Sequence, residues 1–367
     1  MKNERKKLLF ETMKGFNKKH KSEIFILGSE IKELNVIPSG IKTIDDFIGG
    51  GFKRGAHSII WGTYSIGKTA LVLQTIANAQ KLGKLVCYVN TEKPIDPERF
   101  KFFGINLNEM IYIEAPECAE DALEAMRTLC KNKVIDLFII DSTNGLCPKS
   151  VQKTAKGAER GLKKKNVAAL PLALSNFYNI VNSHIFRSKA AIVWIGQART
   201  KGIGGFFAYL GLTGGNAQEF YAYQIMSMKK GEDRNSPVKK FKEYFFDSDK
   251  KLRYETVDDK IGFDVIVQLT KTNSIKSAKR YSKIHIPFLD SKGFVDSVEE
   301  NNNIPIRIDP TASKEDKAEI EKLLIEKGVL QKKDNISTET KIEETILNDE
   351  RLKDKPIKKK KGRPKKK

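Results

Sequence analysis

The chain has 367 residues, of which 40% are apolar, and a formal net charge of +21. This length allows one large domain or two smaller ones, and the apolar share is enough for a folded core. No apolar run approaches the length that crosses a bilayer, and no signal-type segment follows Met1. We therefore expect a soluble cytoplasmic protein with no membrane partner. The excess of positive charge favours a polyanionic partner.

The positive charge is unevenly distributed along the chain. Residues 353–367 hold ten Lys or Arg and one Asp, and the rest of the chain still carries +12. We expect residues 351–367 to form a disordered basic tail. Its sequence KKKKGRPKKK resembles an AT-hook, but the same composition suits a nonspecific duplex-binding arm or a targeting signal, so these interpretations stay open. The four cysteines and four histidines are scattered, which predicts neither a zinc site nor a disulfide framework.

Apolar periodicity predicts an amphipathic helix over residues 3–20, a short strand over 24–27 and a helical turn between 40 and 49. Strand and helix patterns then alternate, which is typical of βαβ units in a mostly parallel, twisted sheet of an α/β protein. The later strands have fewer helices between them and predict an antiparallel extension at one edge. The predicted strands are 57–61, 84–90, 110–113, 135–141, 190–196, 220–228, 263–271 and 281–287, and the predicted helices are 68–82, 97–103, 118–132 and 167–187.

These patterns divide the chain into four parts. Residues 1–34 hold the N-terminal helix and strand, and residues 35–295 form the α/β core. Residues 229–260 are charged and weakly periodic, so we expect a surface insertion in that core. Residues 296–350 form a small C-terminal region, with one helix near 313–327, and residues 351–367 are the basic tail.

The most informative segment is a P-loop, which fits G-x-x-x-x-G-K-[ST] at every position. A predicted strand precedes it and a predicted helix follows it, as a phosphate site requires, so a chance match in a glycine-bearing turn is the weaker alternative. Lys68 would approach the β- and γ-phosphates of ATP, and the Thr69 hydroxyl would contact Mg²⁺. The nucleotide-binding residues of this loop are Gly62, Thr63, Tyr64, Ser65, Ile66, Gly67, Lys68 and Thr69.

Three polar residues follow other predicted strands of the same sheet. Asp141 ends a buried strand and would hold Mg²⁺ through water beside Thr69, unless it only caps the next turn. Glu92 follows the strand at 84–90 and is placed to orient and deprotonate an attacking water, although an exposed loop Glu is common. Gln197 follows the strand at 190–196, where its amide could hydrogen-bond a γ-phosphate and report its loss.

At this point the chain resembles the RecA family of DNA strand-exchange recombinases over roughly residues 3–295. The segment 37–51 is similar to that family's lead into the P-loop, and T-E-K-P-I-D-P at 91–97 is similar to its catalytic-glutamate segment. T-G-G-N-A at 213–217, followed by F-Y-A, closely matches the end of its second DNA-binding loop. The resemblance implies a RecA-like P-loop NTPase fold, with Glu92 activating water and Gln197 sensing ATP.

At several positions this chain differs from the bacterial members of the family. Arg99 lies where bacterial members place an aromatic residue against the adenine, and a guanidinium can also stack on a base. Lys271 matches the first of two lysines that reach a neighbouring subunit's ATP, which gives it a catalytic role. Asn273 occupies the second position, where Lys276 could substitute. The basic tail contrasts with the acidic tails that are usual in bacterial members.

The resemblance locates two DNA-binding loops, at about 150–166 and 198–213. The first loop carries a cluster of cations that could neutralise phosphates, although lysine clusters are often only solvated. The second has glycines, aromatic residues and two cations, which suits a loop that orders on single-stranded DNA better than a partly buried surface loop. The candidate DNA-binding residues are Arg160, Lys163, Lys164, Lys165, Arg199, Lys201, Phe206, Phe207, Gly214, Gly215 and Asn216.

The resemblance implies an ATP- and Mg²⁺-dependent recombinase that binds single-stranded and double-stranded DNA in the cytoplasm, in association with the nucleoid. Its N-terminal helix and strand would dock on the next subunit and build a helical filament, unless the helix packs on its own core. A RecA-fold mediator that binds ATP and DNA without exchanging strands is the alternative. A ring-shaped motor and a small-molecule kinase fit less well, since neither accounts for the T-G-G-N-A match.

Overall fold

The computed structural model describes residues 2–21, 25–30, 35–152, 169–201, 209–298 and 306–326. These residues form two compact units, of which the second combines residues 238–259 with the segment after residue 299. Each unit is described separately. Across the described residues, no helix has both the length and the apolar character that a membrane crossing requires.

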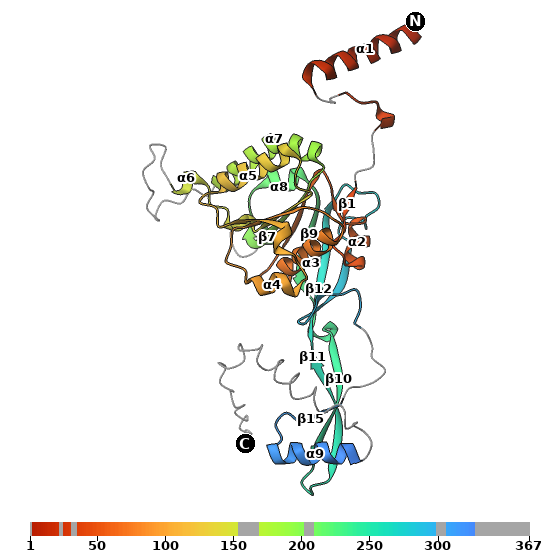
Figure 1. Cartoon of the computed structure of the whole chain (residues 1–367), viewed down its shortest axis with the longest axis vertical. Helices are drawn as coiled ribbons and strands as arrows, with labels where there is room; N and C mark the ends of the chain where they lie inside the picture. The colour runs from red at the N-terminus through yellow and green to blue at the C-terminus, as the bar shows by residue number, and fades with distance from the viewer. Residues whose placement is uncertain are drawn as a thin grey trace, which may run out of the picture. The chain divides into compact units, whose positions relative to one another are not determined.

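The first unit is built on one large sheet with a parallel centre (Figure 1). Its strands run in the order β14-β13-β12-β9-β3-β7-β6-β4-β5, and all neighbours from β9 to β5 are parallel. The pairs β9–β12, β12–β13 and β13–β14 are antiparallel, so the predicted antiparallel extension is confirmed. The strands are β3 (Ala56–Gly62), β4 (Val86–Asn90), β5 (Met110–Glu114), β6 (Leu137–Asp141), β7 (Ala191–Lys201), β9 (Ala222–Lys230), β12 (Gly262–Thr272), β13 (Lys283–Leu289) and β14 (Gly293–Phe294).

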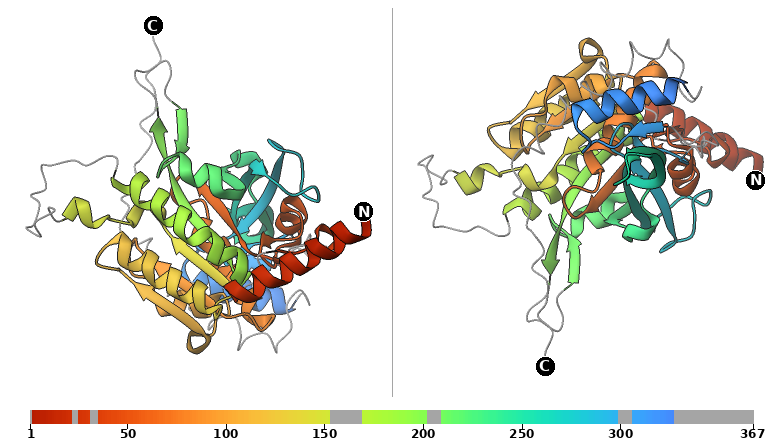
Figure 2. Two further views of the ribbon diagram at one scale, coloured as in Figure 1. Left: turned by 90° about the horizontal axis from the view of Figure 1, so that it is seen from above. Right: turned by 90° about the horizontal axis from the view of Figure 1, so that it is seen from below.

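Helices cover both faces of this sheet, as Figure 1 shows, and the two views of Figure 2 show α5 and α7 side by side. Buried strand residues alternate between two apolar clusters. Ile60 and Ile139 pack with α3 on one face, and Ile59 and Phe138 pack with α5 and α7 on the other. The helices are α2 (Lys42–Ile48), α3 (Lys68–Lys81), α4 (Pro97–Phe102), α5 (Ala119–Asn132), α6 (Lys149–Gln152), α7 (Ala169–Ser188) and α8 (Asn216–Tyr221).

The smaller elements of this unit lie at its turns. β1 (Val36–Ile37) pairs antiparallel with β2 (Phe52–Lys53), which ties the two ends of the α2 segment together. Short 3₁₀ turns lie at η2 (Leu107–Glu109), η3 (Thr143–Gly145) and η4 (Asp233–Asn235). β8 (Tyr209–Leu212) pairs antiparallel with the end of β7 and makes a two-stranded ribbon that the sequence patterns did not predict.

The core of this unit contains a buried histidine. Trp194 Nε1 donates a hydrogen bond to His57 Nδ1 at 3.1 Å, and the ring of Tyr178 packs edge-on against the imidazole. Burial lowers the pKa of His57 to about 3. His57 therefore stays neutral and serves as a packed core residue.

The N-terminal segment differs from the predicted helix and strand. α1 (Lys2–His20) is present, and η1 (Gly28–Glu30) follows it. Residues 25–27 of the predicted strand are not a strand, and residue 24 lies outside the described residues. The backbone N–H of Phe25 donates to Asn17 Oδ1 at 2.9 Å, and Asn17 Nδ2 donates to the Phe25 carbonyl at 2.8 Å. The Asn17 amide therefore occupies the backbone groups that a neighbouring strand would use.

The second unit shows how the expected insertion at residues 229–260 folds. β10 (Val238–Phe246) and β11 (Leu252–Lys260) come from residues 229–260, and β15 (Ile306–Ile308) pairs parallel with β10. The strand order is β11-β10-β15, and α9 (Lys314–Glu326) contacts β10 and β15, with Ile320 and Leu324 buried. The insertion and the C-terminal region thus fold together.

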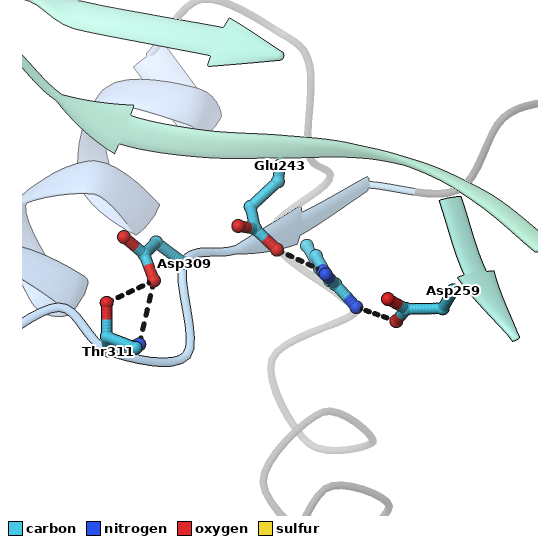
Figure 3. A network of polar contacts seen from close by, with 5 residues as sticks. Glu243, Asp259, Asp309 and Thr311 are labelled. Carbon is cyan, nitrogen blue, oxygen red and sulfur yellow. Dashed lines mark hydrogen bonds and ion pairs between the residues drawn. The ribbon is translucent and has the colours of Figure 1, made fainter. Parts of the chain in front are cut away.

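An ionic network joins the two chain segments of this unit (Figure 3). Arg307 on β15 donates to Glu243 on β10 and to Asp259 on β11. Glu243 is largely buried, and Asp309 closes the following turn by accepting from the hydroxyl and backbone N–H of Thr311. Since Arg307 holds two carboxylates at once, it ties all three strands together.

We predict that Arg307→Met loosens this unit. The change leaves Glu243 and Asp259 without the cation between them, and we expect a loss of about 1–2 kcal/mol for such a partly buried network. The measurement is amide hydrogen exchange of β10. Lys250→Met is the control, because it removes an exposed ion pair with Asp316 and a contact with the Phe246 ring but leaves Glu243 and Asp259 paired with Arg307. Unchanged exchange of β10 in Arg307→Met would contradict this account.

Candidate nucleotide site

The phosphate loop lies where β3 leaves the sheet and α3 begins. Gly67 takes a left-handed conformation, with φ +86°, immediately before the helix. Gly62 lies so close to β9 that a Cβ there would be 2.2 Å from the Met228 carbonyl oxygen. Only glycine fits at Gly62, and the positive φ favours glycine at Gly67. The backbone thus turns tightly into the N-terminal end of α3, a position suited to anions.

Lys68 is buried at the start of α3. Its ammonium donates to the Thr63 carbonyl and, at 3.3 Å, to the Gly62 carbonyl. Burial lowers the pKa of Lys68, and this effect is opposed by the negative charges of Asp141 and Glu92. The ammonium therefore points back into its own loop, where a bound phosphate would give it a stronger partner.

Asp141 at the end of β6 faces the phosphate loop. The Thr69 hydroxyl donates to Asp141 Oδ2 at 2.7 Å, and the Tyr88 hydroxyl donates to the same oxygen at 2.8 Å. Burial raises the pKa of Asp141, and these two hydrogen bonds act in the opposite direction. A hydroxyl and a carboxylate side by side are oxygen donors of the kind that Mg²⁺ prefers, so these residues fit the predicted metal role.

Glu92 and Gln197 meet across the same edge of the sheet. Gln197 Nε2 donates to Glu92 Oε1 at 2.5 Å, and the Ser142 hydroxyl donates to the same oxygen. The backbone N–H of Glu92 donates to Asn90 Oδ1 at 3.3 Å. Glu92 follows β4 and Gln197 lies within β7, and β6 separates these two strands, so the parallel sheet brings the two residues together.

Gln197 is also the base of the ribbon formed by β7 and β8. Its backbone N–H donates to Asn144 Oδ1 at 2.9 Å, and its carbonyl accepts from the Thr213 hydroxyl at 3.1 Å. The Thr213 carbonyl in turn accepts from Gln218 Nε2 at 2.7 Å. A continuous series of hydrogen bonds therefore runs from Glu92 through Gln197 to α8.

The candidate DNA-binding residues are described only in part. Arg199 is exposed on the ribbon, and Lys201 ends β7. Gly214 and Gly215 have φ of +109° and +86°, and Asn216 is exposed at the start of α8. The remaining candidates lie outside the described residues: Arg160, Lys163, Lys164, Lys165, Phe206 and Phe207.

Two predicted residues are not brought to the phosphate loop. The Lys271 ammonium donates to the carbonyls of Glu219 and Phe220, at 2.7 and 2.9 Å, and so caps the C-terminal end of α8. Arg99 is exposed on α4. A role for Lys271 in a neighbouring site and a role for Arg99 at adenine stay predictions.

Four side chains at the site were missed by the sequence patterns, namely Tyr88, Ser142, Asn144 and Gln218. Tyr88 could have been found from the sequence, because it is the residue with a hydroxyl in β4, the strand next to the one that ends in Asp141. Gln218 had none, since its buried position depends on the close approach of Gly214, where a Cβ would lie 1.9 Å from Gln218 Nε2.

A family model described as the RecA N-terminal domain matches residues 7–264. Protein RecA of Thermotoga petrophila is 36% identical over 228 residues, which are 61% of this chain and 60% of that protein. Protein RecA of Mesoplasma florum is 31% identical over 228 residues, which are 61% of this chain and 66% of that protein. The crystal structure of the RadB recombinase superposes with a TM-score of 0.49 at 18% identity and covers 72% of this chain and 100% of that one. The chain thus spans about 60% of the length of the first curated relatives it matches.

We predict that Lys68→Met weakens nucleotide binding while stabilising the nucleotide-free protein. The variant removes a buried charge whose hydrogen bonds go to neutral carbonyls, so the nucleotide-free thermal midpoint should rise by about 2–4 °C. The rise in midpoint that excess ATP and Mg²⁺ cause should disappear. The measurement is thermal unfolding with and without ATP and Mg²⁺.

Lys81→Met is the matched control for this experiment, since Lys81 is exposed in the last turn of the same helix. It should leave both midpoints unchanged. An ATP-induced rise of wild-type size in Lys68→Met would refute the assignment of Lys68 to the phosphate site.

Proposed function

Because the chain belongs to the RecA family, we propose that it is an ATP-dependent recombinase that forms filaments on single-stranded DNA and exchanges strands with a homologous duplex. It would use ATP and Mg²⁺ and act on DNA in the cytoplasm, in association with the nucleoid. The observation that carries the proposal is the hydrogen-bonded series from Glu92 through Gln197 to Thr213, since it links the proposed general base to the ribbon that leads into the proposed second DNA-binding loop.

In this proposal the phosphate loop binds ATP. Backbone N–H groups between Gly62 and Thr69 would surround the phosphates, and Lys68 would leave its own loop carbonyls for them. Mg²⁺, when bound with ATP, supplies positive charge that offsets the charge of the phosphates. Thr69 and Asp141 are the residues that would hold it.

Glu92 would act as the general base. A carboxylate that accepts hydrogen bonds from Ser142 and Gln197 is held in a defined orientation, which a base needs in order to orient and deprotonate water. Gln197 has one amide to share between Glu92 and a γ-phosphate. When the amide donates to the phosphate instead, the Glu92 oxygen can accept a hydrogen bond from the attacking water.

The same rearrangement would reach the DNA. The Gln197 backbone is held by Asn144 and Thr213, so a shift of Gln197 moves the base of the ribbon. Arg199 and Lys201, on that ribbon, would contact phosphates, and the following loop would stack on bases. ATP binding would therefore raise the affinity for single-stranded DNA, and hydrolysis would lower it.

A mediator that binds ATP and DNA without exchanging strands is the second candidate. Asn273 favours it, because the side chain lacks the positive charge that would reach a neighbour's ATP. The backbone N–H of Asn273 donates to the Tyr223 carbonyl at 3.0 Å, which fixes this position against β9. A strand-exchange assay with Gln197→Ala as control separates the two candidates.

We predict that single-stranded DNA stimulates ATP hydrolysis and that Glu92→Gln lowers the turnover number by about 10²–10⁴-fold. The amide keeps the shape of Glu92 but cannot accept a proton, so DNA binding in the presence of ATP should persist. The measurement is phosphate release with and without single-stranded DNA, together with electron microscopy of the same mixtures.

Glu98→Gln is the control, because Glu98 is exposed on α4 and pairs with Lys101. It should hydrolyse ATP as the wild type does. DNA binding with no stimulation of hydrolysis and no filaments would argue for the mediator.

A further inference from the structure

Asp141 has a hydrogen-bond donor that the P-loop motif does not supply. Tyr88 lies on β4, which is paired with β6 in parallel register, with Tyr88 opposite Ile139. Its hydroxyl donates to Asp141 Oδ2 at 2.8 Å. The Thr69 hydroxyl, in the first turn of α3, donates to the same oxygen at 2.7 Å. One carboxylate oxygen therefore receives two donors.

The Tyr88 ring is fixed by its surroundings. Tyr88 is 0% exposed, and its ring stacks on Tyr112 with centroids 5.8 Å apart and an interplanar angle of 7°. Phe100 packs edge-on against it at 5.9 Å. Because this aromatic packing holds the ring, the hydroxyl oxygen cannot move away from Asp141 without a change in the core.

The position of the carboxylate needs such support. Asp141 is 4% exposed, and a buried carboxylate must be hydrogen-bonded to keep its charge. Thr69 has a second predicted task, because its hydroxyl oxygen is also a predicted metal contact. A hydroxyl has one proton to donate and lone pairs that accept, so Thr69 could still donate to Asp141 while its oxygen faces a cation. Tyr88 has no such second task.

We propose that Tyr88 is a positioning residue for the magnesium carboxylate. By holding Asp141 Oδ2, it orients the carboxylate so that the site is ready for Mg²⁺ before the nucleotide arrives. The inference rests on the proposed nucleotide function and adds a residue to it. Partners that orient a metal-holding side chain commonly contribute 10–100-fold to metal affinity.

Tyr112 provides a matched control for Tyr88. It lies opposite Tyr88 in the register of β4 and β5, and its ring is the one that stacks on Tyr88. Its hydroxyl accepts from Asn90 Nδ2 at 2.9 Å and is not the hydroxyl that bonds Asp141. Tyr88→Phe and Tyr112→Phe therefore each remove one hydroxyl from the same aromatic stack, and only the first removes a donor to Asp141.

The test is a titration of the full chain with free Mg²⁺, read by the binding of a fluorescent, non-hydrolysable ATP analogue. We expect Tyr88→Phe to need about 10-fold more Mg²⁺ for half-maximal binding, with unchanged binding of the analogue in EDTA. Tyr112→Phe should match the wild type. Three results would each overturn the inference. The first is an equal Mg²⁺ midpoint for Tyr88→Phe and wild type, and the second is an equal shift of that midpoint in Tyr88→Phe and Tyr112→Phe. The third is a loss of analogue binding by Tyr88→Phe in EDTA that is as large as its loss in Mg²⁺.

The same titration also distinguishes failure of the proposed function from failure of this inference, and it can be run if Tyr88→Phe does not fold. A wild-type chain whose binding of the analogue is independent of Mg²⁺ contradicts the proposed function, and the inference falls with it. If Tyr88→Phe does not fold, 3-fluorotyrosine replaces the residue, because it keeps the ring and makes the hydroxyl a stronger donor. A lower Mg²⁺ midpoint for that change at position 88 but not at position 112 is then expected, and an unchanged midpoint overturns the inference.

Discussion

The hydrogen bond between Thr69 and Asp141 is the contact on which the rest of the site depends. It joins the first turn of α3 to the end of β6, across a sheet in which β7 lies between β3 and β6. Both partners are fixed by apolar packing behind them, with Leu71 on the helix and Ile139 on the strand fully buried. The oxygen donors thus meet because the sheet is parallel and because its two faces are covered by helices.

The same sheet edge gives the site a connection to the ribbon. β7 is the strand that leaves the core after Gln197 and continues into the pairing with β8. Leu212 of β8 packs closely against the backbone of Gly196, where a Cβ would lie 2.4 Å from Leu212 Cδ1. In the proposed function, a change at Gln197 would therefore be passed to a ribbon that is packed tightly at its base. The strand that carries the proposed sensor amide also leads into the proposed DNA-binding loop.

Local patterns in the sequence predicted the central architecture and named the residues that the structure brings together at the phosphate loop, whose roles stay predictions. Alternating apolar runs predicted β3, β6 and β7, and a motif with fixed spacing identified Lys68 and Thr69. Residues that depend on distant partners were harder to predict. β10 and β11 lack strong periodicity, since much of their surface is exposed and their third strand, β15, comes from residues 306–308. Gln218 is buried only because Gly214 leaves it space, which no single position in the sequence reveals.

Residues 25–27 show a second reason for error. Their apolar character is that of a strand, but a strand also needs a partner, and Asn17 takes the backbone groups of Phe25 instead. The secondary structure of such a short segment depends on which groups its backbone can hydrogen-bond. Its apolar side chains include Phe25 and Ile26, which are exposed in the single chain.

Strand exchange itself is the most direct measurement of the central claim. Purified chain, ATP and Mg²⁺ would be mixed with circular single-stranded DNA and a homologous linear duplex, and a nonhomologous duplex of equal length would serve as the control. The account predicts joint molecules that form only with the homologous duplex and that Gln197→Ala fails to produce. ATP-dependent binding of both DNAs without joint molecules would contradict the recombinase function and favour the mediator function.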